Sequence, residues 1–223
     1  MRARVLLHVL IAIALAVLLS LHFFTQPLRP LPDQGTMLQA AINHARGDGL
    51  SVQFADARDL TRIRFERLVY FPPGYPLLIS TMLRVGFDVD RAVKIVNAVA
   101  LVVGLFGWLL LAIPNIDHRW LRILFTILLV LACGGIIPRG GTTDVIFWAG
   151  MPWWILCLIH GRTRRSLLIV AALINAALIS VRWAAVVLTP VAVLAMMPSV
   201  TSAIVVALPP TLAYFAIGAI NRH

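Results

Sequence analysis

Apolar runs long enough to cross a lipid bilayer recur along this chain and constrain its fold more than any other feature. One run follows Arg2 and Arg4, and the later runs cover 92–113, 120–137, 145–160, 166–197 and 201–219. Hydrophobic residues make up 61% of the 223 residues, and charged residues only 13%. A soluble domain of this size cannot bury so much apolar surface. The sequence therefore predicts an integral membrane protein.

The N-terminal run, residues 1–24, resembles a secretory signal peptide in its charge and hydropathy. Its end, LLSLHFFTQP, lacks the small-x-small pattern of a cleavage site, and the run is long enough to span a bilayer. We predict an uncleaved anchor helix whose N-terminus lies in the cytoplasm.

The run 166–197 is too long to be a single crossing. As one helix it would measure about 48 Å at 1.5 Å per residue, against a hydrocarbon core of about 30 Å. Arg182 interrupts the run near its middle. We therefore expect two short helices that meet near the outer surface of the membrane.

The loops between the runs predict the orientation of the helices. The loops PNIDHRWLR at 114–122 and HGRTRR at 160–165 are rich in basic residues, whereas PRGGTTD at 138–144 has one arginine and one acid. The positive-inside rule places the first two loops in the cytoplasm and the third outside. Helix 92–113 must then run from outside to inside, so 25–91 contains no full crossing.

Together these features predict an all-α polytopic membrane protein with about seven transmembrane helices in a single domain. Residues 1–24 form the anchor, 25–91 form an external loop with juxtamembrane helices, and 92–219 form six further transmembrane helices. The first large loop and the C-terminus lie outside.

The external region contains three predicted elements. Asp33 precedes a run with apolar residues at helical spacing, and Gly47 and Gly49 end that run. A second helix is predicted for 57–69, which has four arginines beside two acids. The stretch 70–87 opens with prolines and is too short to span, so we expect it in the interface or re-entering the membrane.

Asp33 has two interpretations. A carboxylate directly after a crossing, held at the membrane surface by Pro30 and Pro32, can abstract a proton from an acceptor hydroxyl. It can also cap the helix that it precedes by accepting backbone N–H groups. The two roles are compatible with each other.

Three other charged sites stand out from the apolar background. Arg182 within an apolar run must face a cavity, a phosphate or the headgroup region. Asp144 is either a ligand in an external loop or an acid at a helix start. The acids of DVD at 88–90 resemble the metal-binding pair of many sugar transferases, but they directly precede a helix, which favours a cap.

Several classes of function lack support in the sequence. The net charge is +10, but the basic residues are scattered through the loops without a long run or a basic-aromatic patch, so nucleic acid is not expected as a partner. Lipid phosphates are the expected partners. No Walker loop, GxSxG, HExxH or zinc-ligand spacing is present.

The order of these motifs resembles that of the GT-C membrane glycosyltransferases, the group with protein O-mannosyltransferases and lipid A aminoarabinose transferases. An anchor leads to PDQGTMLQAAINHARGDGL, then to FPPGYPLLISTMLRVGFDVDRAVKIVNAV, and an external TTD precedes AALINAALISVRWAAVVLTPVAVL. The resemblance covers most of the chain and implies the conserved seven-helix module of that family in a bacterial inner membrane.

The resemblance also implies roles for individual residues. Asp33 falls where the family places its catalytic acid, and Asp144 falls near a second external acid. The residues expected to contact the lipid donor and its phosphate are Arg182, Pro72, Pro73 and Tyr75. A divalent metal is left open as a cofactor, and no metal ligand is assigned.

The function implied by the resemblance is sugar transfer from a polyprenyl-phosphate donor to an acceptor on the external face. The expected partners are the polyprenyl-phosphate lipid and the membrane, with or without a second membrane subunit that supplies the helices that follow the module in members of that family. One alternative is a non-catalytic scaffold or subunit derived from the module. A second alternative is a lipid or small-solute carrier, although the crossings hold few polar groups beyond Asn175 and Arg182.

Overall fold

In the computed structural model, the apolar runs after residue 88 form helices that lie side by side. The structure describes residues 32–56, 59–136, 143–196 and 199–220, together with isolated positions between 10 and 25; the side chains of 55–62, 133–136, 200 and 220 are excepted. The elements are α2 (Pro32–Arg46), β1 (Ser51–Asp56), β2 (Asp59–Arg67), α3 (Gly74–Arg84), α4 (Val89–Ala112), η1 (Ile113–Asn115), α5 (Arg119–Ile136), α6 (Thr143–Gly161), α7 (Ser166–Val181), η3 (Trp183–Val187), α8 (Leu188–Met196) and α9 (Val200–Ile220).

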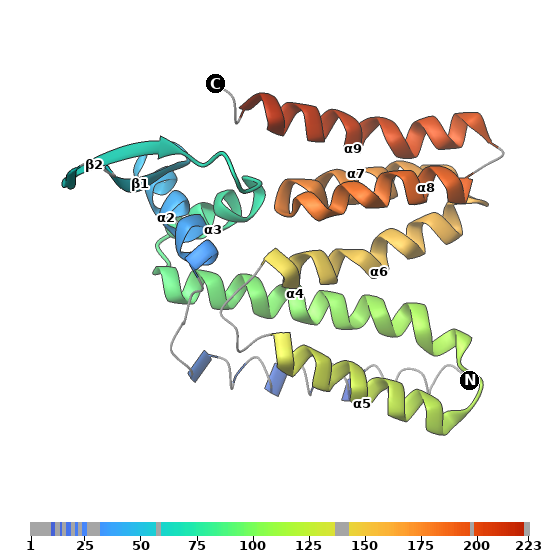
Figure 1. Cartoon of the computed structure of the whole chain (residues 1–223). Helices are drawn as coiled ribbons and strands as arrows, with labels where there is room; N and C mark the ends of the chain where they lie inside the picture. Colours follow the sequence, from blue (N-terminus) through green and yellow to red (C-terminus); the bar gives the residue numbers. More distant parts are fainter. Residues whose placement is uncertain are drawn as a thin grey trace.

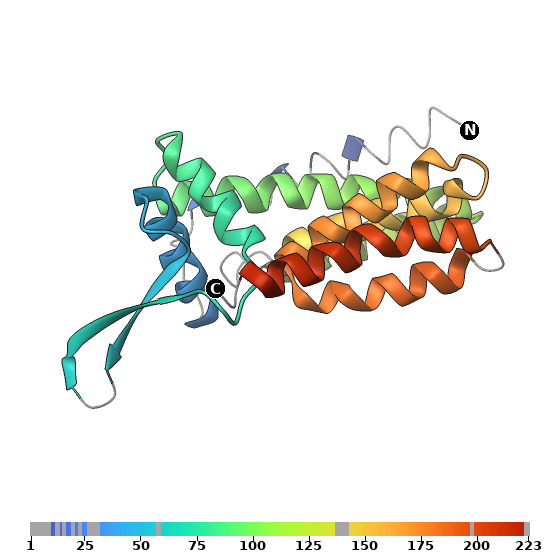
Figure 2. The same cartoon turned by 90° about the horizontal axis from the view of Figure 1, so that it is seen from above.

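The long helices form a bundle, and α2, the two strands and α3 lie at one end of it (Figures 1 and 2). Helix α4 packs on α6, α6 on α7, and α7 and α8 on α9. Helices α2 and α3 pack on each other, and α3 also contacts α4 and α7. The described part of the chain is thus mainly helical, with one small sheet at the end that carries α2.

Three helices are long and apolar enough to cross a membrane by length and composition. They are Val89–Asn115, Thr143–Gly161 and Thr201–Ala219, and two shorter apolar helices cover Ser166–Val181 and Trp183–Met196. The predicted anchor 1–24 lies largely outside the described residues, as do the loop 137–142 and the last three residues.

The predicted break at Arg182 is confirmed. Helix α7 ends at Val181, Arg182 has extended backbone angles of −148° and 123°, and η3 begins at the next residue. The Arg182 N–H still donates to the Leu178 carbonyl at 2.8 Å, so the helix closes its last turn before the chain changes direction. At 16 residues, α7 is about 24 Å long. The extended residue directs the Arg182 side chain out of the helix.

The predicted helix over 57–69 is wrong, and the described part of the chain is mostly helical with one small sheet. Residues 51–56 and 59–67 form an antiparallel hairpin in which Val52 pairs with Glu66 and Phe54 with Arg64. The alternation of polar residues with Ile63 and Phe65 matches the period of a strand, and strand pairing satisfies the backbone of both segments. Val52 is buried with Ala40 and Leu68, which fixes the base of the hairpin on α2.

The first predicted helix and the short proline-led segment are confirmed as local structure. Helix α2 ends at Arg46, and Gly47 follows with φ at +99°, the left-handed conformation that glycine adopts most readily at a helix end. Helix α3 has 11 residues, about 16 Å, and is therefore too short to cross a bilayer.

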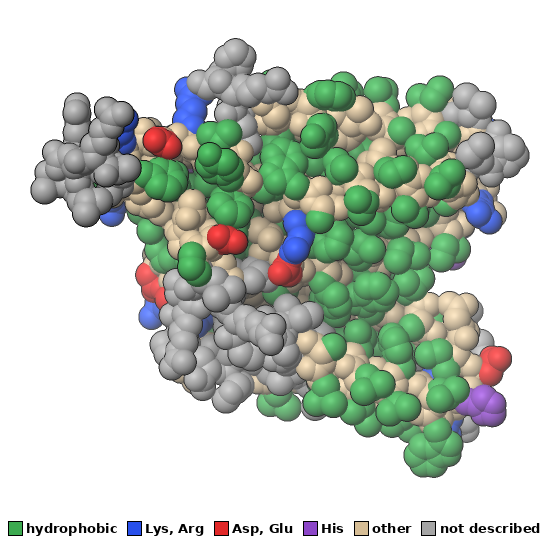
Figure 3. Space-filling model, viewed as in Figure 1, with side chains coloured by type: hydrophobic (Ala, Val, Ile, Leu, Met, Phe, Trp, Pro, Cys, Tyr) green, Lys and Arg blue, Asp and Glu red, His purple; other side chains and the backbone are tan. Residues whose placement is uncertain are grey.

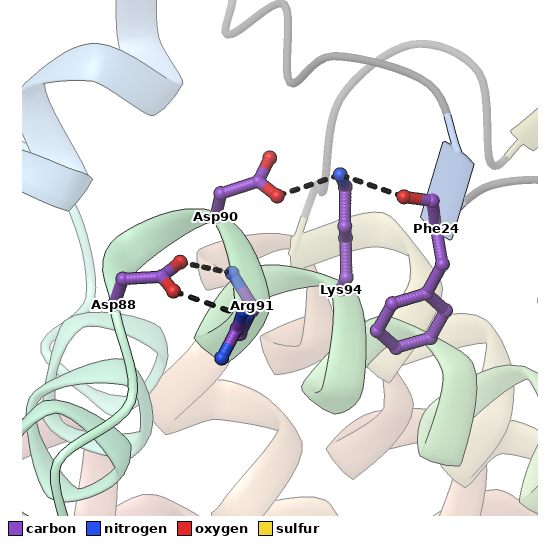
Figure 4. A network of polar contacts seen from close by, with 5 residues as sticks. All are labelled: Phe24, Asp88, Asp90, Arg91 and Lys94. Carbon is purple, nitrogen blue, oxygen red and sulfur yellow. Dashed lines mark hydrogen bonds and ion pairs between the residues drawn. The ribbon is translucent and has the colours of Figure 1, made fainter.

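The two acids of the DVD sequence make contacts within the protein (Figure 4). The Asp88 side chain accepts from the Arg91 backbone N–H at 2.8 Å, so the predicted cap of α4 is confirmed. The Asp90 carboxylate accepts from Lys94 Nζ at 2.6 Å, and Lys94 also donates to the Phe24 carbonyl at 3.2 Å. Lys94 is 4% exposed, and a buried charge requires such partners. These acids therefore stabilise the start of α4.

Gly74 allows α3 to contact α7 closely. A Cβ at this position would lie 2.5 Å from the Ser180 carbonyl oxygen, which is backbone and cannot move aside easily. We expect Gly74→Ala to lower the free energy of unfolding by about 1–3 kcal/mol, as overpacking does in other cores. Thermal unfolding of the purified protein measures this effect.

The matched control is Gly35→Ala within α2, where an added Cβ would meet nothing within 4 Å. Alanine favours helix over glycine by up to about 1 kcal/mol, so this variant should unfold at an unchanged or higher temperature. Equal unfolding temperatures of Gly74→Ala and Gly35→Ala would contradict the close contact between α3 and α7.

Candidate functional site

A pocket of about 400 Å³ opens where α2, the chain before α3, the start of α6 and the break after α7 meet. Its lining residues are Asp33, Gln34, Met37, Tyr70, Phe71, Pro72, Thr143, Asp144, Val181, Arg182, Trp183 and Ala184. Acidic and basic side chains gather at this end of the molecule, whereas the face over α6 to α9 is mainly hydrophobic (Figure 3). The pocket therefore combines charged groups with an apolar surrounding.

Asp33 enters the pocket from the first turn of α2. An N-cap residue precedes the first residue of its helix. Helix α2 begins at Pro32, so Asp33 lies within its first turn and is not in the N-cap position. A carboxylate in the first turn interacts favourably with the positive end of the helix dipole. The residue is exposed, whereas its neighbour Gln34 is only 3% exposed. The Asp33 carboxylate is thus accessible to a bound molecule.

Arg182 and Asp144 form an ion pair in the same pocket. The two residues lie 38 positions apart, on the break after α7 and in the first turn of α6. Their side chains are 41% and 50% exposed, so neither is sealed from solvent. A half-exposed pair of this kind exchanges partners at little cost, because its net contribution is about 0–1 kcal/mol. The guanidinium is therefore available to an incoming anion.

Contacts between the walls hold the pocket in shape. Trp183 donates its ring N–H to the Tyr70 carbonyl at 3.3 Å, which links η3 to the chain before α3. The Trp183 ring also packs edge-on against Tyr214 of α9, with ring centroids 5.7 Å apart. These contacts fix the residue next to Arg182 from two sides.

The predicted proline and tyrosine residues divide into two groups. Pro72 lines the pocket, whereas Pro73 and Tyr75 do not. Tyr75 is fully buried in a cluster with Met37 and Ile79, and this burial raises the pKa of its phenol above the ordinary value. Tyr75 is therefore neutral at physiological pH and supports the pocket from behind by packing.

A second pocket, of about 560 Å³, has almost entirely apolar walls. It is formed by α3, α4, α6 and α7, and its lining residues are Leu78, Met82, Ile95, Val96, Val99, Ala100, Val103, Ile146, Ala149, Gly150, Trp153, Ile174, Ala177 and Leu178. Both pockets use α6 and the end of α7. Asp144 of the first pocket and Ile146 of the second are two positions apart, and Val181 of the first and Leu178 of the second are three positions apart. An apolar chain and a polar head can thus be accommodated by the same two helices.

Sequence analysis missed the aromatic and polar part of the pocket wall. Tyr70, Trp183, Gln34 and Thr143 line it, and each is a direct sequence neighbour of a predicted site residue or of the proline motif. No cluster of three or more His, Cys, Asp or Glu side chains occurs among the described residues. The pocket therefore has two acids and one arginine as its charged groups.

Comparison of the chain with protein-family models, with curated proteins and with solved structures gave no match. The resemblance to GT-C glycosyltransferases therefore stays a prediction. Any functional conclusion depends on the chemistry of the pocket residues.

Proposed function

We propose that this chain transfers a sugar from a polyprenyl-phosphate donor to an acceptor at the external face of a membrane. The observation that supports this most is the meeting of Asp33, Asp144 and Arg182 in one pocket. These residues come from three elements that are far apart in the sequence. The reaction needs a base that removes a proton from the acceptor and a cation that stabilises the leaving phosphate. A carboxylate and a guanidinium beside an apolar pocket can supply these two functions.

In the proposed reaction, Asp33 removes the proton of an acceptor hydroxyl. The acceptor oxygen then attacks the anomeric carbon of the sugar and forms the new glycosidic bond. The bond between that carbon and the phosphate oxygen breaks, and its electron pair leaves with the polyprenyl phosphate. Arg182 stabilises the charge that develops on the phosphate, because its planar fork donates two parallel hydrogen bonds. No nucleotide is needed, since the donor contains its own leaving group.

Asp144 holds Arg182 in place before the donor binds. The ion pair neutralises the guanidinium within largely apolar surroundings. When a phosphate enters, the remaining N–H groups of the guanidinium can donate to it while the Asp144 contact keeps the side chain oriented. Asp144 is therefore a positioning residue in this proposal.

The apolar pocket supports a lipid-linked donor over a soluble one. Its walls are side chains of Leu, Ile, Val, Ala, Met and Trp with almost no polar atom exposed. A polyprenyl chain already lies in hydrocarbon within a membrane, so the pocket would hold it by van der Waals packing against these walls. The donor lipid would lie in this pocket with its phosphate toward Arg182.

The proposal includes the seven-helix topology with the pocket outside. The junction of α4 with α5 and the junction of α6 with α7 lie at the opposite end of the bundle from α2 (Figure 1). Both junctions are rich in arginine, as the positive-inside rule requires of cytoplasmic loops. The chain acts either alone or together with a second membrane subunit.

Cysteine labelling tests this topology. In a cysteine-free background, Val85→Cys should react with a membrane-impermeant maleimide in intact cells, because Val85 is 72% exposed on the pocket side. Arg164→Cys should react only after the cells are permeabilised. Reversed labelling of the two positions would contradict the proposed orientation.

The experiment that tests the function is a transfer assay with purified protein in lipid nanodiscs and a radiolabelled polyprenyl-phosphate sugar. We expect release of polyprenyl phosphate and label in a membrane or periplasmic acceptor fraction. A second candidate is a non-catalytic scaffold, in which the Asp144–Arg182 ion pair serves only to hold the start of α6 against the break after α7. A scaffold would bind neither the sugar donor nor its lipid phosphate product.

A further inference from the structure

A second charged pocket lies at the opposite end of the bundle from Asp33 and Arg182. It has a volume of about 400 Å³, and its lining residues are Gly161, Arg162, Arg165, Ala195, Met196, Ser199 and Ser202. It is formed between the α6–α7 junction and the region between α8 and α9. Along α6 it is about 26 Å from Asp144, so it is distinct from the proposed transfer site.

The positive charge of this pocket has little compensation within the chain. Asp117 and Asp144 are the only acids after residue 90 in the sequence, and Asp144 pairs with Arg182 at the other end. No carboxylate among the described residues pairs with Arg162 or Arg165. The charge of the pocket therefore favours an anion over a cation.

Hydrogen bonds hold the pocket walls in position. Arg162 donates through Nη2 to the Ala195 carbonyl at 3.1 Å, which ties the α6–α7 junction to the end of α8. A guanidinium has five N–H donors, so this contact leaves donors for a ligand. The Ser199 and Ser202 hydroxyls are 3.0 Å apart on the opposite wall and add hydroxyl groups to the pocket. Two arginines and two hydroxyls suit the oxygens of a phosphate.

An apolar pocket adjoins the charged one. It has a volume of about 200 Å³ and is lined by Leu158, Ile159, Arg162, Ala195 and Met196, three of which also line the charged pocket. Ile159 is 52% exposed on the outside of the bundle. The site thus presents a cationic cavity next to an apolar one, as an amphiphile requires.

We propose that this paired site binds an anionic phospholipid of the leaflet at this end of the bundle. The phosphate lies between Arg162 and Arg165, and an acyl chain follows the adjoining apolar pocket. Basic pockets between transmembrane helices bind anionic headgroups by the same chemistry. The apolar neighbour favours a lipid over a free phosphate ion. The inference does not depend on sugar transfer, since it uses none of the residues of the transfer site.

Native mass spectrometry of the delipidated full chain in detergent tests the proposal. The probes are dioleoylphosphatidylglycerol and dioleoylphosphatidylcholine, and inorganic phosphate is the competitor. We expect phosphatidylglycerol to bind at least about tenfold more tightly than phosphatidylcholine. Both lipids have a phosphate, but the choline group of phosphatidylcholine makes the headgroup net neutral and is repelled by the two arginines of the pocket. Inorganic phosphate at millimolar concentration should not displace the lipid.

Arg162→Gln combined with Arg165→Gln should remove the preference for phosphatidylglycerol. The matched control is Arg164→Gln, which removes an exposed arginine of the same junction that does not line the pocket. Arg165→Gln alone leaves the Arg162–Ala195 hydrogen bond intact, so it should fold normally and still weaken binding of phosphatidylglycerol.

Three results would overturn the proposal. If Arg164→Gln lost the preference for phosphatidylglycerol as fully as the double variant, the lipid would be attracted by surface charge in general. If Arg165→Gln bound phosphatidylglycerol as tightly as the wild type, the pocket would not hold the headgroup. Displacement by inorganic phosphate would identify a site for a free anion.

Discussion

Replacement of Asp33 by asparagine is expected to lower the rate of sugar transfer by about 10²–10⁴-fold, the usual contribution of a positioned general base. Asparagine has almost the same shape as aspartate but cannot accept the proton of the acceptor hydroxyl. Because Asp33 is exposed in the first turn of α2, the substitution should leave the thermal stability nearly unchanged. The transfer assay and a thermal unfolding curve on the same preparation measure the two effects.

Asp48→Asn is the matched control for Asp33→Asn. Asp48 is also an exposed acid next to α2, but it follows the helix and does not line the pocket. Its substitution should leave transfer unchanged. Retention of full activity by Asp33→Asn would exclude the proposed base, and loss of activity in both variants would indicate a general effect of charge on this region.

Replacement of Arg182 by alanine is expected to lower transfer by about 10²–10³-fold, the loss that follows removal of one preorganised donor to a developing negative charge. Binding of polyprenyl phosphate should weaken in parallel, because the phosphate loses a bidentate partner. Lysine keeps the charge but lacks the planar fork. The transfer rate and lipid affinity of Arg182→Lys should therefore lie between those of the wild type and those of Arg182→Ala. Lipid binding and kcat/KM, both measured in nanodiscs, test these expectations.

Asp144→Asn separates a role in phosphate binding from a role in the ion pair. If Arg182 serves the phosphate, Asp144→Asn should retain most of the binding of polyprenyl phosphate, whereas Arg182→Ala should lose it. If the two residues serve only to hold α6 and the α7–η3 break together, both variants should lower thermal stability equally and bind the lipid alike. The pair is half exposed, so its loss should cost no more than about 1 kcal/mol of stability.

The local features that sequence predicted well are those with one dominant physical cause. The length of 166–197 and the cost of a guanidinium within an apolar run predicted the break at Arg182, although this stretch contains neither proline nor glycine near the break. A short acid before an apolar helix predicted the Asp88 cap, and Gly47 predicted the end of α2. In each case a single residue determines the backbone locally.

The hairpin at 51–67 was mispredicted because its second half fits two periods. Residues 57–69 place apolar side chains at spacings that suit either a helix or a strand, and only the pairing with 51–56 decides between them. That pairing is a tertiary property, and the short connection at 57–58 lacks the Asn-Gly or Asp-Gly signal that announces many hairpins.

The composition of the pocket depended on packing that the sequence alone does not define. Asp33, Asp144 and Arg182 were each identified as candidates, but their meeting requires α2 to dock beside the starts of α6 and η3. Tyr75 was assigned to the donor cavity by resemblance, whereas the turn of α3 buries it against Met37 and Ile79. Neighbouring residues on a helix face different directions, so a sequence motif does not by itself determine which of its side chains line a pocket.

A structure of the chain in a lipid nanodisc with polyprenyl phosphate would show directly whether Asp33 and Arg182 surround the donor phosphate. We expect the phosphate to lie within hydrogen-bond distance of the Arg182 guanidinium, on the same side of the pocket as Asp33, with the polyprenyl chain along the apolar walls of α4, α6 and α7. A phosphate bound elsewhere, with the Arg182–Asp144 pair intact and the pocket empty of lipid, would contradict this expectation.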